Sequence, residues 1–263
     1  MEENSVLIDA TREGLAVITL NRPQIHNAFN APMVARLSDI LDELKGADGV
    51  KVVLLDGAGE NFSAGADLEW MRAAADYTHH DNLQDARALA HMLYNLTSLP
   101  QPTIALIDGA ARGGGVGLAA ACDIAIATRG ATFAFTETRL GLIPATISPF
   151  VIAAIGPRAA RRYFMTAESF DAAEARRIGL VHKVVENKEA LAAESELLVD
   201  EILRNGPGAV RAAKDLVNAV TKGRDAESVL ETVAQRIADR RGTDEAKEGM
   251  AAFLDKRKPS WVS

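Results

Sequence analysis

Apolar positions along the chain follow two different periods, and these predict strands and helices. Short runs of β-branched and aliphatic residues have the length of strands, at 6–9, 15–20, 50–55, 103–107 and 124–127. Apolar residues at helical spacing occur at 30–45, 85–97 and 115–121. Asn30 is a preferred N-cap for the first of these helices, and Pro32 suits its first turn. Strands that alternate with helices predict an α/β fold with crossover connections.

From about Ala190 onward the pattern contains helices alone, and Pro207 is a suitable first residue for one of them. The apolar residues of this part stand at helical spacing, as in amphipathic helices. We therefore expect a core over residues 1–195 and a C-terminal helical region over residues 196–263. Because the helical region carries many apolar positions, we expect it to cover the active site and to support self-association.

Composition and charge exclude several classes of protein. Hydrophobic residues make up 48% and charged residues 25%, as in an ordinary globular protein. The net charge of −7 argues against a nucleic-acid binder, which needs a broad basic face. No apolar run approaches the roughly 20 residues of a membrane span, and no signal-peptide pattern is present. The single cysteine, Cys122, is predicted to be a buried, unreactive thiol, and its isolation suits a reducing compartment, so we expect a cytoplasmic protein.

The histidines do not indicate a metal site. None of them stands with other potential ligands at the spacing of a zinc site. They are His26, His79, His80, His91 and His182. We expect no bound metal.

Two strand-to-helix turns contain the candidate ligand-binding residues. The first, residues 60–68, has small residues at 63–66 that allow a ligand to approach the backbone, and then Asp67, which suits a first helical turn. The second, residues 108–117, contains Gly113-Gly114-Gly115 just before a predicted helix. A glycine-rich helix N-terminus exposes backbone N–H groups and is a ready anion site, although such glycines also serve tight turns and close packing.

Better-known motifs do not fit these turns. Asn61 stands where the nucleophile elbow G-x-S-x-G needs its first glycine, so Ser63 is not a predicted nucleophile. Leu118 stands where a dinucleotide-binding G-x-G-x-x-G needs its last glycine, and the segment is not a Walker A sequence. What remains is one N–H donor from each turn. Two converging donors make an oxyanion hole.

Taken together, these segments resemble the crotonase (enoyl-CoA hydratase/isomerase) family over nearly the whole chain. The matching motifs are Asn21-Arg22-Pro23, Asn27-Ala28-Phe29, residues 62–67, Gly113-Gly114-Gly115, residues 121–124, Phe135-Thr136-Glu137, residues 141–144, residues 170–185 and residues 253–258. The resemblance implies a spiral of repeated β-β-α units, and it implies trimers or hexamers built as dimers of trimers. It also implies an acyl-coenzyme A substrate, of which coenzyme A is a part, and no separate cofactor.

The resemblance assigns roles by position. The backbone N–H groups of Ala66 and Gly114 would hold the thioester oxygen as it becomes an enolate, and Glu137 would be the acid–base residue. The remaining implied substrate-binding residues are Arg22, Ala28, Ser63, Ala64, Gly65, Asp67, Leu68, Gly113, Gly117, Arg112, Arg139 and Lys256. Among these, Arg22 and Lys256 are candidates for phosphate contacts, together with Arg257 and Lys258.

Gly117 is the main departure from the family pattern. Many hydratases of the family use two glutamates; Glu137 aligns with one, and Gly117 stands at the position of the other. Three alternatives follow: a hydratase in which Glu137 alone activates water and returns its proton to carbon, a Δ3,Δ2-enoyl-CoA isomerase, or a non-catalytic acyl-CoA-binding scaffold. An apolar cleft around Glu137 is expected to raise the pKa of its carboxyl group.

A second departure concerns the acyl group. Residues 145–150 resemble the bacterial branch that acts on methylglutaconyl-CoA and isohexenylglutaconyl-CoA, where glycine also recurs at the second glutamate position. Such substrates carry a second carboxylate, and the planar guanidinium of Arg112 or Arg139 is a candidate partner for it. The prediction is therefore an enoyl-CoA hydratase for a branched, carboxylated substrate such as 3-methylglutaconyl-CoA.

Overall fold

The computed structural model describes residues 4–221 and 226–262. Its main sheet has the strand order β1-β2-β3-β4-β6-β9. These strands are Val6–Asp9, Gly14–Leu20, Val50–Gly57, Thr103–Ile107, Ile124–Thr128 and Lys183–Val185. Only the β1–β2 pair is antiparallel, and the other neighbours run parallel, as crossover connections require. The predicted strands and their α/β class are confirmed.

A smaller sheet makes the fold a spiral. It has the order β5-β7-β8, with β5 at Ala110–Arg112, β7 at Thr132–Ala134 and β8 at Phe170–Asp171. The chain passes from β4 in the large sheet to β5 in the small one and then into α4, Gly114–Ala121. It repeats this path through β6, β7, the 3-10 helix η2 (Glu137–Leu140) and α5 (Ser148–Thr166). These turns are the expected β-β-α units.

Helices on one face of the large sheet enclose the main core. They are α1 (Ala31–Lys45), α3 (His79–Thr97), α4 and α5, and the short η1 (Pro23–Ile25) and α2 (Leu68–Ala74) precede α1 and α3. Asn30 caps α1 as predicted, since its side chain accepts a hydrogen bond from the Met33 N–H. The core joins the inward side chains of the strands to those of these helices, for example Leu55 with Leu37 and Leu93.

The other face of the sheet is covered by α7, Lys188–Leu203. The predicted division at residues 195 and 196 falls inside this helix. Leu191 and Val199 lie on either side of that division and pack into the same apolar cluster on the sheet. Both halves of α7 therefore pack on the sheet together with the core.

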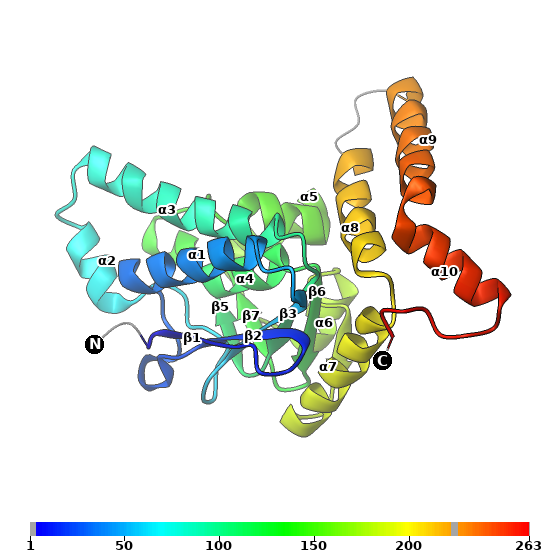
Figure 1. The fold of residues 1–263 in the computed structure, drawn as a ribbon. Helices are drawn as coiled ribbons and strands as arrows, with labels where there is room; N and C mark the ends of the chain where they lie inside the picture. Colours follow the sequence, from blue (N-terminus) through cyan, green and yellow to red (C-terminus); the bar gives the residue numbers. More distant parts are fainter. Residues whose placement is uncertain (1–3, 222–225, 263) are drawn as a thin grey trace.

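The C-terminal helices stand beside the core as an arm (Figure 1). They are α8 (Pro207–Thr221), α9 (Ala226–Gly242) and α10 (Asp244–Leu254). Polar contacts join α8 to the core: Lys214 Nζ lies 2.6 Å from an Asp123 carboxylate oxygen, and the Arg211 guanidinium donates to the Val50 carbonyl oxygen. Within the described residues neither α8 nor α9 contains a buried side chain, so the arm adds little to the core.

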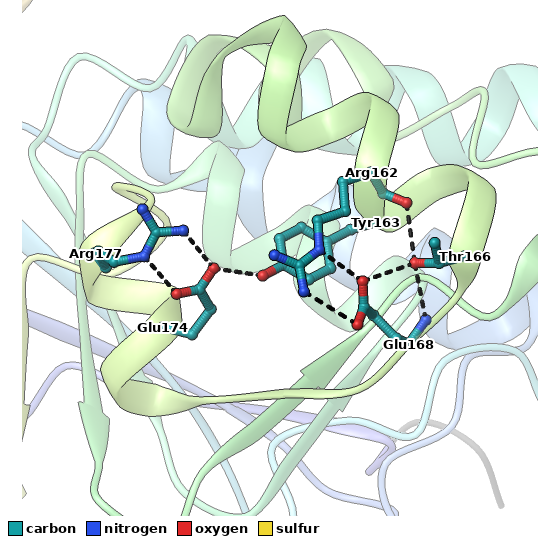
Figure 2. A network of polar contacts seen from close by, with 6 residues as sticks. All are labelled: Arg162, Tyr163, Thr166, Glu168, Glu174 and Arg177. Carbon is teal, nitrogen blue, oxygen red and sulfur yellow. Dashed lines mark hydrogen bonds and ion pairs between the residues drawn. The ribbon is translucent and has the colours of Figure 1, made fainter.

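A polar network joins α5 to α6, Ala172–Arg177 (Figure 2). The buried phenol of Tyr163 donates to a Glu174 carboxylate oxygen at 2.5 Å, and Arg177 pairs with the same carboxylate. Arg162 extends the network to Glu168. The Arg177 contact is the main reason that the pKa of Glu174 falls to about 2.

Candidate active site

The first backbone donor is the N–H of Ala66. The segment around Phe29 pairs with the turn on both sides of Ala66: the Phe29 N–H donates to the Gly65 carbonyl at 2.7 Å, and the Asp67 N–H donates to the Phe29 carbonyl at 2.8 Å. This pairing leaves the Ala66 N–H turned away from the Phe29 segment. It has no acceptor within residues 4–221 and 226–262.

The second donor is the N–H of Gly114 at the start of α4. Gly113 precedes the helix with φ = +47°, a conformation that favours glycine, and its own N–H donates to the Ala134 carbonyl. Gly114 is the first residue of the helix, so no carbonyl within the helix accepts from its N–H, and none elsewhere in the described chain does. A Cβ atom at Gly114 would lie 3.0 Å from the Phe29 ring, which explains the absence of a side chain there.

Ala66 and Gly114 both line one mainly apolar cavity of about 470 Å³. Its walls come from the two predicted turns, from α2 and α3, and from η2 with the loop that follows it. The lining residues include Phe29, Ala64, Gly65, Ala66, Leu68, Trp70, Met71, Leu89, Gly113, Gly114, Leu142, Pro144 and Ile147. The cavity has the size and the mainly apolar walls of a small-molecule site.

Glu137 lies in the wall of this cavity, at the first residue of η2. Its Oε2 atom is buried and has no hydrogen-bond partner within the described residues. Its Oε1 atom lies against Gly113, where a Cβ atom would approach it to 3.1 Å. Burial raises the pKa of the Glu137 carboxyl group, as the sequence predicted, although its own backbone N–H partly offsets the rise. A carboxyl group in the cavity wall with a raised pKa is a candidate for proton transfer.

Ile147 closes the space beside Gly117. A Cβ atom at position 117 would lie 2.3 Å from Ile147 Cγ2 and 2.9 Å from Ile147 Cβ. The buried Ile147 side chain also lines the cavity. The site therefore presents an aliphatic side chain where a second carboxylate would otherwise project.

Comparison with known proteins agrees with this geometry. The model of the enoyl-CoA hydratase/isomerase family matches residues 10–263. The chain belongs to this family. It is 33% identical to the short-chain-enoyl-CoA hydratase of Clostridium acetobutylicum over 265 residues, which cover 98% of this chain and 97% of that protein.

Solved structures of the family share the fold. A putative enoyl-CoA hydratase/isomerase (crotonase) from Legionella pneumophila is 42% identical, with a TM-score of 0.92 and coverage of 98% of each chain. An enoyl-CoA hydratase from Shewanella pealeana is 40% identical, with a TM-score of 0.94 and coverage of 98% of this chain and 96% of that one. The spiral is therefore the crotonase fold.

Several residues that the family resemblance assigns to the ligand also hold the turn together. Ser63 is fully buried, and its hydroxyl donates to the Asn27 carbonyl oxygen. Asp67 caps α2 by accepting from the Glu69 N–H and lies 2.9 Å from the Arg22 guanidinium. Arg22 also donates to the carbonyl oxygen of Ala28, which is buried. The cavity lining does not include Ser63, Asp67, Arg22 or Ala28.

The structure also separates the predicted carboxylate partners from the cavity. The Arg112 guanidinium donates to the carbonyl and hydroxyl oxygens of Thr132 in the small sheet, and burial lowers its pKa. Arg139 is exposed on η2, and Lys256 is exposed after α10. Neither Arg112, Arg139, Lys256 nor Gly117 lines the cavity. A contact of either arginine with an acyl carboxylate therefore stays a prediction.

The cavity contains polar residues that the sequence analysis did not select. Asn82 and Asp85 lie three positions apart on α3 and line the same wall as Ala86 and Leu89. Burial raises the pKa of the Asp85 carboxyl group. The helical spacing of these residues was available in the sequence, but the face of α3 that meets the cavity was not.

Other features carry no site. The described residues contain no group of three or more His, Cys, Asp or Glu side chains that could hold a metal ion. Burial raises the pKa of the Cys122 thiol to about 12, which fits the predicted unreactive thiol. Over residues 4–221 and 226–262, every helix is too short or too polar for a membrane span.

Proposed function

We propose that the chain is an enoyl-CoA hydratase that adds water across the α,β double bond of an acyl-CoA thioester. One observation carries the proposal: Ala66 and Gly114, whose N–H groups have no acceptor within the described residues, line the same cavity as Glu137. Two donors and one base are the parts that a water addition through an enolate needs.

Glu137 and the two N–H groups each act at a defined step of the reaction. Glu137 takes a proton from water, and the water oxygen bonds to Cβ of the enoyl group. The π electrons move to the thioester, whose oxygen becomes an enolate oxygen held by the Ala66 and Gly114 N–H groups. When the enolate collapses, Glu137 returns the proton to Cα. One carboxylate both takes the proton from water and returns it to Cα, since Ile147 occupies the place of a second carboxylate.

The first experiment follows loss of the conjugated thioester absorbance with crotonyl-CoA and 3-methylglutaconyl-CoA. Glu137→Gln should lower turnover by about 10²-fold or more while thioester binding is retained, since general acid–base groups typically contribute 10²–10⁴-fold. Glu69→Gln is the matched control, because Glu69 lies on α2 and does not line the cavity. Persistence of every thioester with the wild-type protein would count against a hydratase.

A Δ3,Δ2-enoyl-CoA isomerase is the second candidate, and the single carboxylate favours it because moving a double bond needs only one proton shuttle. Incorporation of ¹⁸O from labelled water separates the two, since only hydration places solvent oxygen in the product. A non-catalytic acyl-CoA-binding scaffold would bind thioesters and show no turnover that depends on Glu137.

For the acyl group we keep the branched, carboxylated class that the sequence resemblance supports, with 3-methylglutaconyl-CoA as the test compound. The cavity has room for a branched acyl chain, and its walls are mainly apolar. Arg112 and Arg139 are not among its lining residues, and their role toward a second carboxylate stays part of this proposal.

We also propose that the arm of α8–α10 supports a trimer or a hexamer. Apolar side chains remain exposed on it, notably Ile237, Phe253 and Leu254. Leu142 and Ile143 are likewise exposed at the cavity. Exposed apolar side chains gathered in this way are typical of protein contacts. Sedimentation of the wild type and of Phe253→Asp tests this: a smaller particle for the variant supports it, and a wild-type monomer contradicts it.

A further inference from the structure

The two turns that carry the oxyanion donors are joined by a short parallel bridge. The Ser63 N–H donates to the Ala110 carbonyl oxygen at 3.0 Å, and the Arg112 N–H donates to the Ser63 carbonyl oxygen at 2.9 Å. Ser63 is thereby paired with Ala111, and each donor residue follows its member of this pair by three positions. The register of the bridge therefore sets how far apart the two N–H groups lie.

The two turns also touch where glycines remove the side chain. A Cβ atom at Gly109 would lie 2.9 Å from Asn61 Oδ1, and one at Gly115 would lie 2.8 Å from Ser63 Cβ. Closely packed groups transmit a displacement instead of absorbing it. A shift of Asn61 or Ser63 should therefore move the second turn as well.

Asn61 is the side chain that connects the turns at the start of the bridge. Its Oδ1 atom accepts from the Ala110 N–H at 2.8 Å, and its Nδ2 atom lies 2.9 Å from His26 Nδ1. Its carbonyl oxygen accepts from the Asn27 side chain at 2.8 Å. Asn61 is not among the residues that line the cavity, so it can act on the reaction only through the position of the two turns.

The contact with Ala110 also orients the Asn61 amide. Because Oδ1 accepts the Ala110 N–H, the NH₂ end faces the imidazole of His26 and donates to Nδ1. The His26 carbonyl oxygen in turn accepts from the Ala64 N–H of the first turn at 2.8 Å. The amide therefore spans the space between the segment that holds the first turn and the first residue of β5, and the length of the Asn61 side chain fixes that span.

We propose that Asn61 is a positioning residue that sets the spacing of the Ala66 and Gly114 N–H groups, and thereby how strongly they polarise the thioester carbonyl. The inference rests on the proposed function, because it takes the thioester oxygen to lie at these two groups. Oxyanion donors stabilise developing charge only when they point at the position of the oxygen. A longer or a missing side chain at position 61 should therefore weaken the polarisation, whereas one of equal length should preserve it.

Isotope-edited infrared spectroscopy of bound butanoyl-CoA, labelled with ¹³C at the carbonyl, tests the inference. Hydrogen bonds to a carbonyl oxygen weaken the C=O bond, so the wild-type protein should lower its stretching frequency relative to the free thioester. Asn61→Ala removes the amide and Asn61→Gln lengthens the side chain by one methylene group, so both should lose most of this shift. Asn61→Asp should keep the shift, because a carboxylate of the original length can accept from both Ala110 and His26.

Asn95→Ala is the matched control, since the Asn95 side chain is hydrogen-bonded to Asp42 and Lys45 and does not line the cavity. It should keep the wild-type frequency. With crotonyl-CoA, kcat of Asn61→Ala and Asn61→Gln should fall by about 10-fold to 10²-fold, since a misplacement of roughly 1 Å can cost about 10²-fold.

A wild-type frequency in Asn61→Gln overturns the inference even where Asn61→Ala fails to fold, and so does a wild-type protein that leaves the carbonyl frequency unchanged. Because butanoyl-CoA cannot be hydrated, such a failure is distinguishable from a loss of Glu137-dependent turnover.

Discussion

Ile147 and Gly117 are in direct steric competition: a Cβ atom at 117 would lie 2.3 Å from Ile147 Cγ2. Gly117→Glu alone should therefore not supply a second acid, and it should destabilise the protein by about 1–3 kcal/mol, the usual cost of overpacking. Denaturant unfolding measures this cost, and the hydration rate should fall with it.

Shortening the Ile147 side chain should reduce the destabilisation that Gly117→Glu causes. In Gly117→Glu with Ile147→Ala, the new carboxylate gains the space that the isoleucine leaves. The double variant should be more stable than the sum of the single effects by at least about 0.5 kcal/mol, as expected for residues in contact. Additive effects would show that Ile147 is not what excludes a side chain at 117.

Replacing Gly114 by proline should remove one oxyanion donor. Proline has no N–H and is tolerated at the first residue of a helix, so α4 should form. Loss of one such donor lowers kcat by about 10²–10³-fold in comparable sites. Gly114→Ala is the control, because it makes a similar contact with Phe29 but keeps the N–H. Equal kcat values for the two variants would argue against the Gly114 N–H as a donor.

The raised pKa of Glu137 has a defined effect on stability. A carboxyl group whose pKa is higher in the folded state destabilises that state when it ionises. The cost is absent below the unfolded pKa, near 4.5, and is complete above the folded pKa. Glu137→Gln should therefore be more stable than the wild type at pH 8, and the difference should vanish near pH 3.5. Unfolding at both pH values checks this, and a difference that does not depend on pH would contradict it.

Ionisation of Glu174 should stabilise the folded protein, which is the opposite of the effect of Glu137. Its pKa is lowered to about 2, first by Arg177 and then by Tyr163 (Figure 2). The network therefore contributes stability that is complete above the unfolded pKa, near 4.5, and is lost as pH falls through about 2. Glu174→Gln should be less stable than the wild type at pH 6 and should approach it near pH 2. Unfolding monitored by circular dichroism at each pH measures the difference.

The Arg22–Asp67 pair should stabilise the turn that holds Ala66. Its side chains are 15% and 11% exposed, whereas those of Arg129 and Glu186 are 74% and 64% exposed. Arg22→Leu should cost about 3–5 kcal/mol, since it leaves a buried carboxylate unpaired. Arg129→Leu, the matched control, should cost no more than about 1 kcal/mol. Equal losses of unfolding free energy in the two variants would show that the Arg22–Asp67 pair is not effectively buried.

The sequence by itself determined the elements and the family. The strand-like run at 103–107 and the Asn30 cap come from local periodicity and local hydrogen bonding, so the structure reproduces both. Ala66 and Gly114 lie in turns whose small residues are visible in the sequence, and Glu137 lies in a motif of ordered spacing. The cavity that brings these three residues together was therefore predictable in outline.

Tertiary structure alone decided which side chains face that cavity. Arg112 is next to Gly113 in the chain, yet strand alternation turns its side chain toward Thr132 and away from the cavity. Asp85 and Ile147 reach the cavity because α3 and the loop before α5 pack around it. Local sequence sets the helix and its period, but the face that meets the ligand depends on how distant elements pack, and no local pattern records that packing.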